Sequence, residues 1–101
     1  MHIILVDLQL APLNFDWDKG NERKSEEKHQ ILNIEAESTF RDLDRLILIS
    51  NRSREVRFLC IGTSFLKRIL TSYFLVRDGK VRIIGTRVAR EKEKELYCKS
   101  K

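Results

Sequence analysis

The sequence contains few residues that break or cross-link a chain. Among its 101 residues are four glycines, one proline and two cysteines. This glycine and proline content excludes a collagen-like repeat, and the 42% hydrophobic content excludes an intrinsically disordered chain. No hydrophobic run approaches the roughly 18 residues that a membrane-spanning helix requires. We therefore expect one folded domain over residues 1–101, with no membrane partner.

The start of the chain and the cysteines indicate a cytoplasmic protein. Residues 1–13 are apolar, but they lack the basic segment and small-residue cleavage site of a secretory signal. Cys60 and Cys98 allow at most one disulfide, which is not expected without secretion. Cys60 lies in the apolar run 58–61 and is expected to be buried, rather than to act as a nucleophile beside His29.

Neither a metal site nor a phosphate-binding loop is indicated. The two histidines and two cysteines lack the C-x2-C or H-x3-H spacing of a zinc site, and each glycine is isolated from the others. The sequence therefore predicts no metal and no other cofactor.

The net charge of +5 is concentrated at the C-terminal end. Residues 77–101 hold nine lysines and arginines against four acidic residues, whereas residues 1–76 are neutral overall. Such asymmetry favours a polyanionic partner, either nucleic acid or an acidic protein segment, although a merely solubilising tail accounts for it equally well.

Hydrophobic patterning predicts an α+β fold. Short apolar runs predict strands at 3–10, 46–49, 55–61, 69–76 and 81–88, and the Asp78-Gly79 pair predicts a hairpin between the last two. Helices are expected at about 19–29, 34–40 and 89–99, the first capped by Asp18. The expected architecture is an antiparallel sheet of three to five strands with two N-terminal helices and one C-terminal helix, packed on one face. Residues 1–14 are either an N-terminal extension or an extra strand.

Three arginines stand out because they lie in or beside otherwise apolar strands. A buried guanidinium must be paired, so Arg57, Arg82 and Arg87 are candidates for binding phosphate, with a single surface-directed arginine as the ordinary alternative. Arg82 and Arg87 are five residues apart, which would place them on opposite faces of a regular strand. Either a bulge near Gly85 corrects this, or Arg87 already lies beyond the end of the strand.

Several short motifs together resemble the BrnT family, the toxin halves of type II toxin–antitoxin pairs. The resemblance extends from Phe15 to Tyr97. The residues that carry it are Phe15-x-Trp17-Asp18, Lys28-His29, Ala36, Phe40-x-Asp42, Glu55-x-Arg57-Phe58, Ile61-Gly62, Arg82-Ile83-Ile84, Arg87, Ala89, Glu93 and Tyr97.

This resemblance implies a RelE-like fold and a ribonuclease that arrests growth by cleaving RNA, with mRNA as the substrate. It also implies a BrnA-like ribbon-helix-helix antitoxin as partner, through which the toxin would be connected to DNA only indirectly. RNA cleavage without metal requires a base for the 2′-hydroxyl, an acid for the leaving 5′-oxygen, and cations around the transition state.

The candidate catalytic residues follow from that chemistry. Histidine is the side chain that titrates near neutral pH, so His29 beside Lys28 is a candidate base or acid, or a residue that packs the helix. Arg57, Arg82 and Arg87 are candidates for phosphate binding. Glu55 is either the base or, more in keeping with a two-residue spacing along one strand face, the group that orients Arg57.

The candidate RNA-binding residues lie near the C-terminus, and they are Arg90, Lys92 and Tyr97. Tyr97 would stack on a base or donate to phosphate, although an aromatic residue on a terminal helix is commonly part of the core. Trp17 is expected to be a core residue.

The chain also departs from the family pattern. The family usually has Lys, Asn and Gly at Asn21, Ser25 and Gln30, and Ser-Ala at Gly85-Thr86. Two alternatives to an active ribonuclease stay open, the first from the basic C-terminal quarter of the chain and the second from these departures. One is a non-catalytic RNA- or protein-binding module, and the other is a decayed toxin that only binds its antitoxin.

Overall fold

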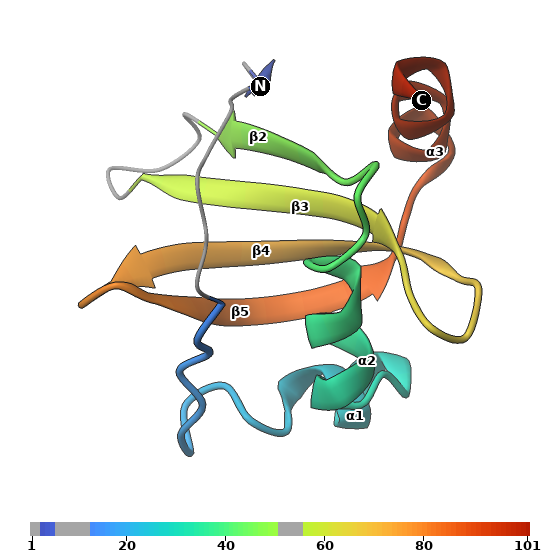
Figure 1. The fold of residues 1–101 in the computed structure, drawn as a ribbon. Helices are drawn as coiled ribbons and strands as arrows, with labels where there is room; N and C mark the ends of the chain where they lie inside the picture. Colours follow the sequence, from blue (N-terminus) through green and yellow to red (C-terminus); the bar gives the residue numbers. More distant parts are fainter. Residues whose placement is uncertain (1–2, 6–12, 51–55) are drawn as a thin grey trace.

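Five antiparallel strands form one sheet in which neighbours in the chain are neighbours in space (Figure 1). The computed structural model describes residues 3–5, 13–50 and 56–101. Its strands are β1 (Ile3–Leu5), β2 (Leu46–Ser50), β3 (Arg57–Thr63), β4 (Ile69–Arg77) and β5 (Lys80–Val88). Helices α1 (Lys24–His29) and α2 (Asn33–Thr39) precede β2, and α3 (Glu91–Ser100) follows β5. The predicted α+β class and the predicted order of two N-terminal helices and one C-terminal helix are confirmed.

The strand predictions are confirmed closely where the structure describes the chain. Asp78 and Gly79 both have positive φ angles, 52° and 73°, as a two-residue hairpin turn of type I′ requires. The predicted first strand is present as β1, which pairs with β2, whereas residues 6–10 of that prediction lie outside the described residues. None of the helices in the described ranges is long and apolar enough to cross a membrane.

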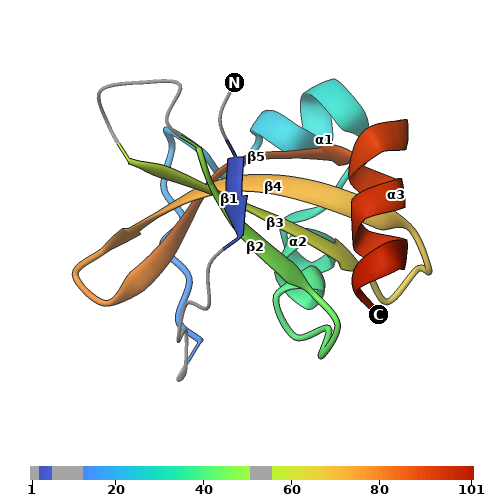
Figure 2. The same ribbon diagram turned by 90° about the horizontal axis from the view of Figure 1, so that it is seen from above.

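The prediction that all helices pack on one face of the sheet is wrong. Ala36 of α2 and Phe40 pack on one face with Ile47 of β2, whereas Tyr97 of α3 packs on the other face with Leu46 and Leu48. Figure 2 shows the helices grouped around one end of the sheet rather than in one layer. Successive residues of β2 point to opposite faces of the sheet, and each face has its own hydrophobic core. The strand is therefore apolar along most of its length.

Helix α2 approaches β3 at a glycine. A Cβ atom at Gly62 would lie 2.7 Å from the carbonyl oxygen of Thr39, so only glycine permits this contact. The apolar pattern predicted that Gly62 lies just beyond the strand and ends it. The structure instead places it inside β3, where its missing side chain sets the distance between helix and sheet.

An ion pair joins α2 to the turn between β3 and β4. The carboxylate of Glu35 is 2% exposed and accepts hydrogen bonds from the Ser64 hydroxyl (2.7 Å) and from Arg68 Nε (2.9 Å). A second nitrogen of Arg68 also contacts this carboxylate. The hydrogen bond from Arg68 holds the pKa of Glu35 below its ordinary value, so Glu35 stays ionised in its buried position.

Helix α1 is shorter than predicted and begins at Lys24 rather than Lys19. Asp18 does not cap it. The Asp18 carboxylate instead accepts the backbone N–H of Gly20 at 2.8 Å and two hydrogen bonds from Arg82, at 2.9 and 3.0 Å. Residues 18–23 therefore form turns, because the capping carboxylate is used by a local turn and by a distant strand.

Gln30 ends α1 in the left-handed conformation, with φ 57° and ψ 40°. A residue with a Cβ atom is strained there, so we expect Gln30→Gly to raise the free energy of unfolding by about 0.5–1 kcal/mol. Urea unfolding followed by circular dichroism measures this. Gln30→Ala keeps the Cβ atom and should give no stabilisation; equal stabilisation by Gly and Ala would show that the backbone strain is not the cause.

Candidate functional site

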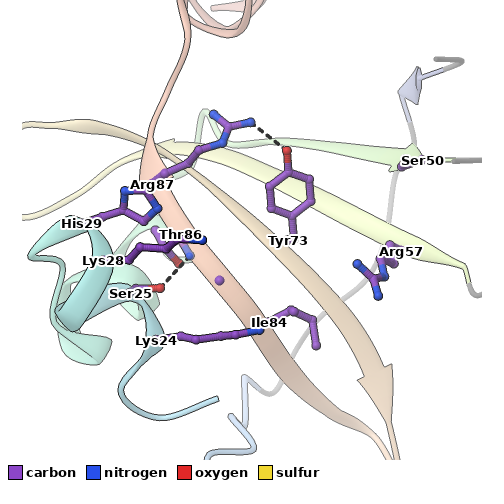
Figure 3. Close-up of a pocket in the computed structure, with 11 residues that line it drawn as sticks. Lys24, Ser25, Lys28, His29, Ser50, Arg57, Tyr73, Ile84, Thr86 and Arg87 are labelled. Carbon is purple, nitrogen blue, oxygen red and sulfur yellow. Dashed lines mark hydrogen bonds between the residues drawn. The ribbon is translucent and has the colours of Figure 1, made fainter. Parts of the chain in front are cut away.

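A pocket of about 340 Å³ lies between α1 and the sheet, on the face that α3 covers further along (Figure 3). Four of its lining residues, Lys24, Lys28, Arg57 and Arg87, carry cationic side chains. The residues that line it are Lys24, Ser25, Lys28, His29, Ser50, Arg57, Tyr73, Ile84, Gly85, Thr86 and Arg87. Among the described residues no carboxylate lines the pocket, so its interior attracts anions.

Helix α1 supplies the lysines and the histidine. Lys24 and Lys28 are four residues apart and so lie on one side of the helix, with His29 beside them. Two hydrogen bonds hold this segment against the outer edge of β5. The Ser25 hydroxyl accepts the backbone N–H of Thr86 at 2.7 Å, and the Asn21 amide donates to the carbonyl of Ile83 at 2.8 Å. These bonds close the β5 edge and fix the position of α1.

A β-bulge brings Arg87 to the pocket side of the sheet. Tyr73 pairs with Gly85 but Phe74 pairs with Ile83, so Ile84 is an extra residue in β5. After this shift Arg87 pairs with Thr71 and projects from the same face as Tyr73. The predicted correction of the five-residue spacing is therefore confirmed, with the bulge at Ile84 and Gly85.

Tyr73 and Arg57 face α1 across the pocket. Figure 3 shows Tyr73 of β4 and Arg57 of β3 on one side, with the lysines and His29 of α1 on the other. Arg57 pairs with Ser50 in the sheet, so both project from this face. Lys24, Lys28, His29 and Arg57 are exposed, which leaves their polar groups accessible to a ligand.

Arg87 is bound by a carboxylate of α3. Its two terminal nitrogens donate to Glu93 at 2.7 and 2.9 Å, and one of them also donates to the Tyr73 hydroxyl at 2.8 Å. Its guanidinium also lies 5.4 Å from the centre of the Tyr73 ring. Arg87, which was predicted to be free for phosphate, therefore has its charge largely compensated by Glu93.

Charge on both members of this pair is strongly favoured. The hydrogen bond to Glu93 raises the pKa of the Arg87 guanidinium. Burial alone would raise the pKa of Glu93, but hydrogen bonds from Arg87, the Arg90 amide and Thr71 outweigh it and hold that pKa below its ordinary value. The pair therefore stays ionised across the pH range in which enzymes usually act.

Arg82 is not part of the pocket. Although it projects from the same face of β5, its guanidinium is held by Asp18 and by Asp16, the latter at 3.4 Å. Arg82 therefore anchors the loop at residues 16–20 and does not line the pocket, and a role for it in binding phosphate remains a prediction.

The C-terminal candidates also lie outside the pocket lining. The Tyr97 side chain is 1% exposed, and its hydroxyl bonds to Asp42 and to Thr63, so it is a core residue and not a surface for stacking RNA bases. Arg90 precedes α3, and its backbone N–H donates to Glu93 at 2.8 Å. Lys92 is exposed on α3.

Two other predictions concern Glu55 and Cys60. Glu55 lies outside the described residues. Cys60 is fully buried in β3, and burial raises the pKa of its thiol to about 12, as expected for a core cysteine rather than a nucleophile. Within the described ranges, no three His, Cys, Asp or Glu side chains gather as metal ligands would.

Lys24, Tyr73 and the role of Glu93 were not predicted from the sequence. Tyr73 lies in the apolar run 69–76, where its alternation with core residues gave no sign of a pocket. Its polar hydroxyl was the only available signal, since a tyrosine in a strand requires a hydrogen-bond partner for that group. Arg87 and Glu93 are six residues apart and lie in different elements, one in β5 and the other in α3. Their pairing depends on the turn between these elements, which the sequence pattern does not reveal.

The departures from the family pattern are accommodated differently. Asn21 is buried, and its amide bonds to the backbone at Asp16 and Ile83. Because this position does not line the pocket, having Asn21 where the family has lysine removes no cation from the pocket. Ser25 supplies the hydroxyl that accepts from Thr86, and Gln30 adopts the positive φ that glycine would adopt more easily. Gly85 leaves space in the pocket, since a Cβ atom there would have no atom within 4 Å in the part of the chain that the structure describes.

Comparison with known proteins identifies the family of the chain. The family model of the ribonuclease toxin BrnT, of type II toxin–antitoxin systems, matches residues 17–93, which include α1, all of β2 to β5 and the described pocket. A search of curated proteins finds no match. The chain therefore belongs to the BrnT family of ribonuclease toxins, which implies an RNA target and an antitoxin partner.

Proposed function

We propose that this protein is a cytoplasmic, growth-arresting toxin that cleaves RNA in the pocket between α1 and the sheet, without a metal ion. The observation that carries the proposal is the pocket itself, where Lys24, Lys28 and His29 face Arg57 and Tyr73. We further propose that mRNA is the substrate and that a BrnA-like ribbon-helix-helix protein is the antitoxin.

The charge of the pocket supports a phosphate ligand. The RNA backbone carries one negative charge per nucleotide, and exposed lysines and arginines that converge on one space neutralise it. The same cations would repel a divalent metal ion, because each adds to the positive potential of the site. The pocket is therefore suited to metal-independent cleavage, in which protein cations stabilise the charge of the transition state.

Proton transfer requires a group that is near the phosphate and titrates in the neutral range. Among the described residues, the histidine that lines the pocket is His29. An imidazole is suited to take the proton from the 2′-hydroxyl. The 2′-oxygen then attacks phosphorus and the bond to the 5′-oxygen breaks, which gives a 2′,3′-cyclic phosphate and a 5′-hydroxyl. Arg57 and Lys28 would stabilise the charge on the non-bridging oxygens.

The test is cleavage of end-labelled RNA in EDTA by the wild type, Lys28→Gln and Arg57→Gln. We expect the wild type to cleave in EDTA and each variant to cleave roughly tenfold or more slowly, because each loses one preorganised cation. Lys99→Gln is the matched control. Lys99 is exposed on α3, so its loss changes the net charge equally but should leave cleavage unchanged.

Two outcomes would contradict the proposal. Equal loss of activity in Lys99→Gln would mean that overall charge matters rather than the pocket. A wild type that binds RNA or the antitoxin but never cleaves, with or without ribosomes, would favour the binding module or the decayed toxin.

A further inference from the structure

We infer that Tyr73 is the proton donor to the leaving 5′-oxygen, and that Arg87 and Glu93 are the residues that position it. This inference rests on the proposed ribonuclease function and deepens it. It assigns the second proton transfer of the reaction and gives Arg87 a role other than binding phosphate.

The direction of one hydrogen bond carries the argument. A guanidinium can only donate, so in the 2.8 Å contact between Arg87 and Tyr73 the phenolic oxygen is the acceptor. The hydroxyl hydrogen must then point away from Arg87. Tyr73 lines the pocket, and Figure 3 shows it standing between Arg87 and Arg57 opposite α1. The proton of Tyr73 is thus available to a ligand in the pocket.

Glu93 fixes Arg87 in this orientation. Besides the contacts with Arg87, its Oε1 atom accepts the Arg90 amide at 2.8 Å and the Thr71 hydroxyl at 3.0 Å. A carboxylate with four donors cannot easily rotate, and the bidentate contact fixes the plane of the guanidinium. Arg87 is only 14% exposed and is committed to Glu93 and Tyr73, which leaves little of it for phosphate.

The chemistry balances without a further reagent. The 2′-oxygen forms its bond to phosphorus and passes its proton to His29, while the bond from phosphorus to the 5′-oxygen breaks. The departing 5′-oxygen takes the Tyr73 proton. The phenolate that remains keeps the hydrogen bond that Arg87 donates to it, which stabilises it until a proton returns from His29 through solvent. Both groups then regain their starting state.

The test is Tyr73→Phe on two RNAs of the same sequence, one natural and one with sulfur in place of the leaving 5′-oxygen at the cleaved position. Thiolate leaves without being protonated, so a variant that lacks only the acid should recover on it. We expect Tyr73→Phe to cleave natural RNA about 100-fold more slowly than the wild type. On the sulfur-linked RNA it should match the wild type.

The alternatives give different results. An equal loss on both RNAs, or no loss on either, would overturn the assignment of Tyr73 while leaving the ribonuclease proposal intact. A wild type that cleaves neither RNA would overturn the proposed function and this inference with it. Thermal unfolding of Tyr73→Phe checks folding, since the substitution removes one hydroxyl from a partly exposed ring.

Glu93→Gln tests the positioning role. It keeps the side-chain shape but weakens the hold on Arg87, so we expect kcat on natural RNA to fall with little change in KM, and the sulfur-linked RNA to restore the rate. A rise in KM with kcat unchanged would mean that Arg87 contacts phosphate after all. Because Glu93 also bonds at the start of α3, the assay is run well below the unfolding temperature of the variant.

Discussion

Gly85→Leu is expected to slow RNA cleavage by about a hundredfold or more while leaving the protein folded. Gly85 lies in the pocket lining, opposite Tyr73 in the sheet, and no atom of the described residues would lie within 4 Å of a Cβ atom there. A leucine would therefore project into empty pocket space without displacing the core. The leucine side chain would keep the RNA phosphate away from the cations of the pocket. We expect this to cost about 3 kcal/mol of transition-state stabilisation or more, which corresponds to a rate roughly a hundredfold lower.

Gly85→Ala is the matched control, because its methyl group occupies little of the pocket. We expect it to retain most of the activity, and both variants to unfold in urea at least as late as the wild type, since glycine is unfavourable within a strand. Undiminished cleavage by a folded Gly85→Leu variant would place the active site elsewhere on the molecule.

Arg68→Met is expected to lower the free energy of unfolding by about 2–3 kcal/mol at neutral pH. Of the described hydrogen-bond donors that hold the Glu35 carboxylate, which is 2% exposed, only the Ser64 hydroxyl would remain. The expected loss is below that of a fully buried pair because the Arg68 side chain is 36% exposed, so solvent already weakens the attraction.

The pH dependence has a definite sign. In the wild type the pKa of Glu35 is lowered, so its contribution is complete above the ordinary value of 4.5 and is lost as the pH falls through the lower folded value. In Arg68→Met the buried carboxylate lacks its cation and burial raises its pKa, so acid relieves the destabilisation. The difference in free energy of unfolding between the two proteins should therefore narrow from pH 7 to pH 4.

Urea unfolding at several pH values measures that difference. Glu35→Gln combined with Arg68→Met is the control, because removing both charges leaves no buried ion and should recover much of the stability. A double variant no more stable than Arg68→Met would show that packing of the arginine side chain, rather than the unpaired carboxylate, accounts for the loss.

Local signals in the sequence were sufficient for most of the sheet. Strands β2 to β5 are short apolar runs bounded by polar residues, and Asp78-Gly79 specifies its own turn, so each could be predicted from neighbouring residues. The start of α1 could not. Asp18 has the properties of a helix cap, but its carboxylate is bound by Arg82, which is 64 residues away in the chain.

The site was predictable only in part for a similar reason. Lys28, His29, Arg57 and Arg87 were singled out by residue type, and the pocket does bring them together. Arg87 lines the pocket and Arg82 does not. The difference follows from their acidic partners, which lie in α3 for Arg87 and in the loop at residues 16–20 for Arg82, and no local sequence pattern shows either pairing. Tyr73 was missed because a tyrosine in an apolar strand is the same in sequence whether its hydroxyl faces a core or a pocket.

The extra residue in β5 has a consequence for how relatives of this protein can be recognised. A regular strand places residues four apart on the same face, whereas a strand with one bulge does the same for residues five apart. Arg82 and Arg87 share a face only because Ile84 is inserted between them. Loss of that single residue would straighten the strand without moving either arginine to the other face. A signature for this kind of surface should therefore admit both spacings, because a pattern with one fixed interval would separate proteins whose three-dimensional arrangement is the same.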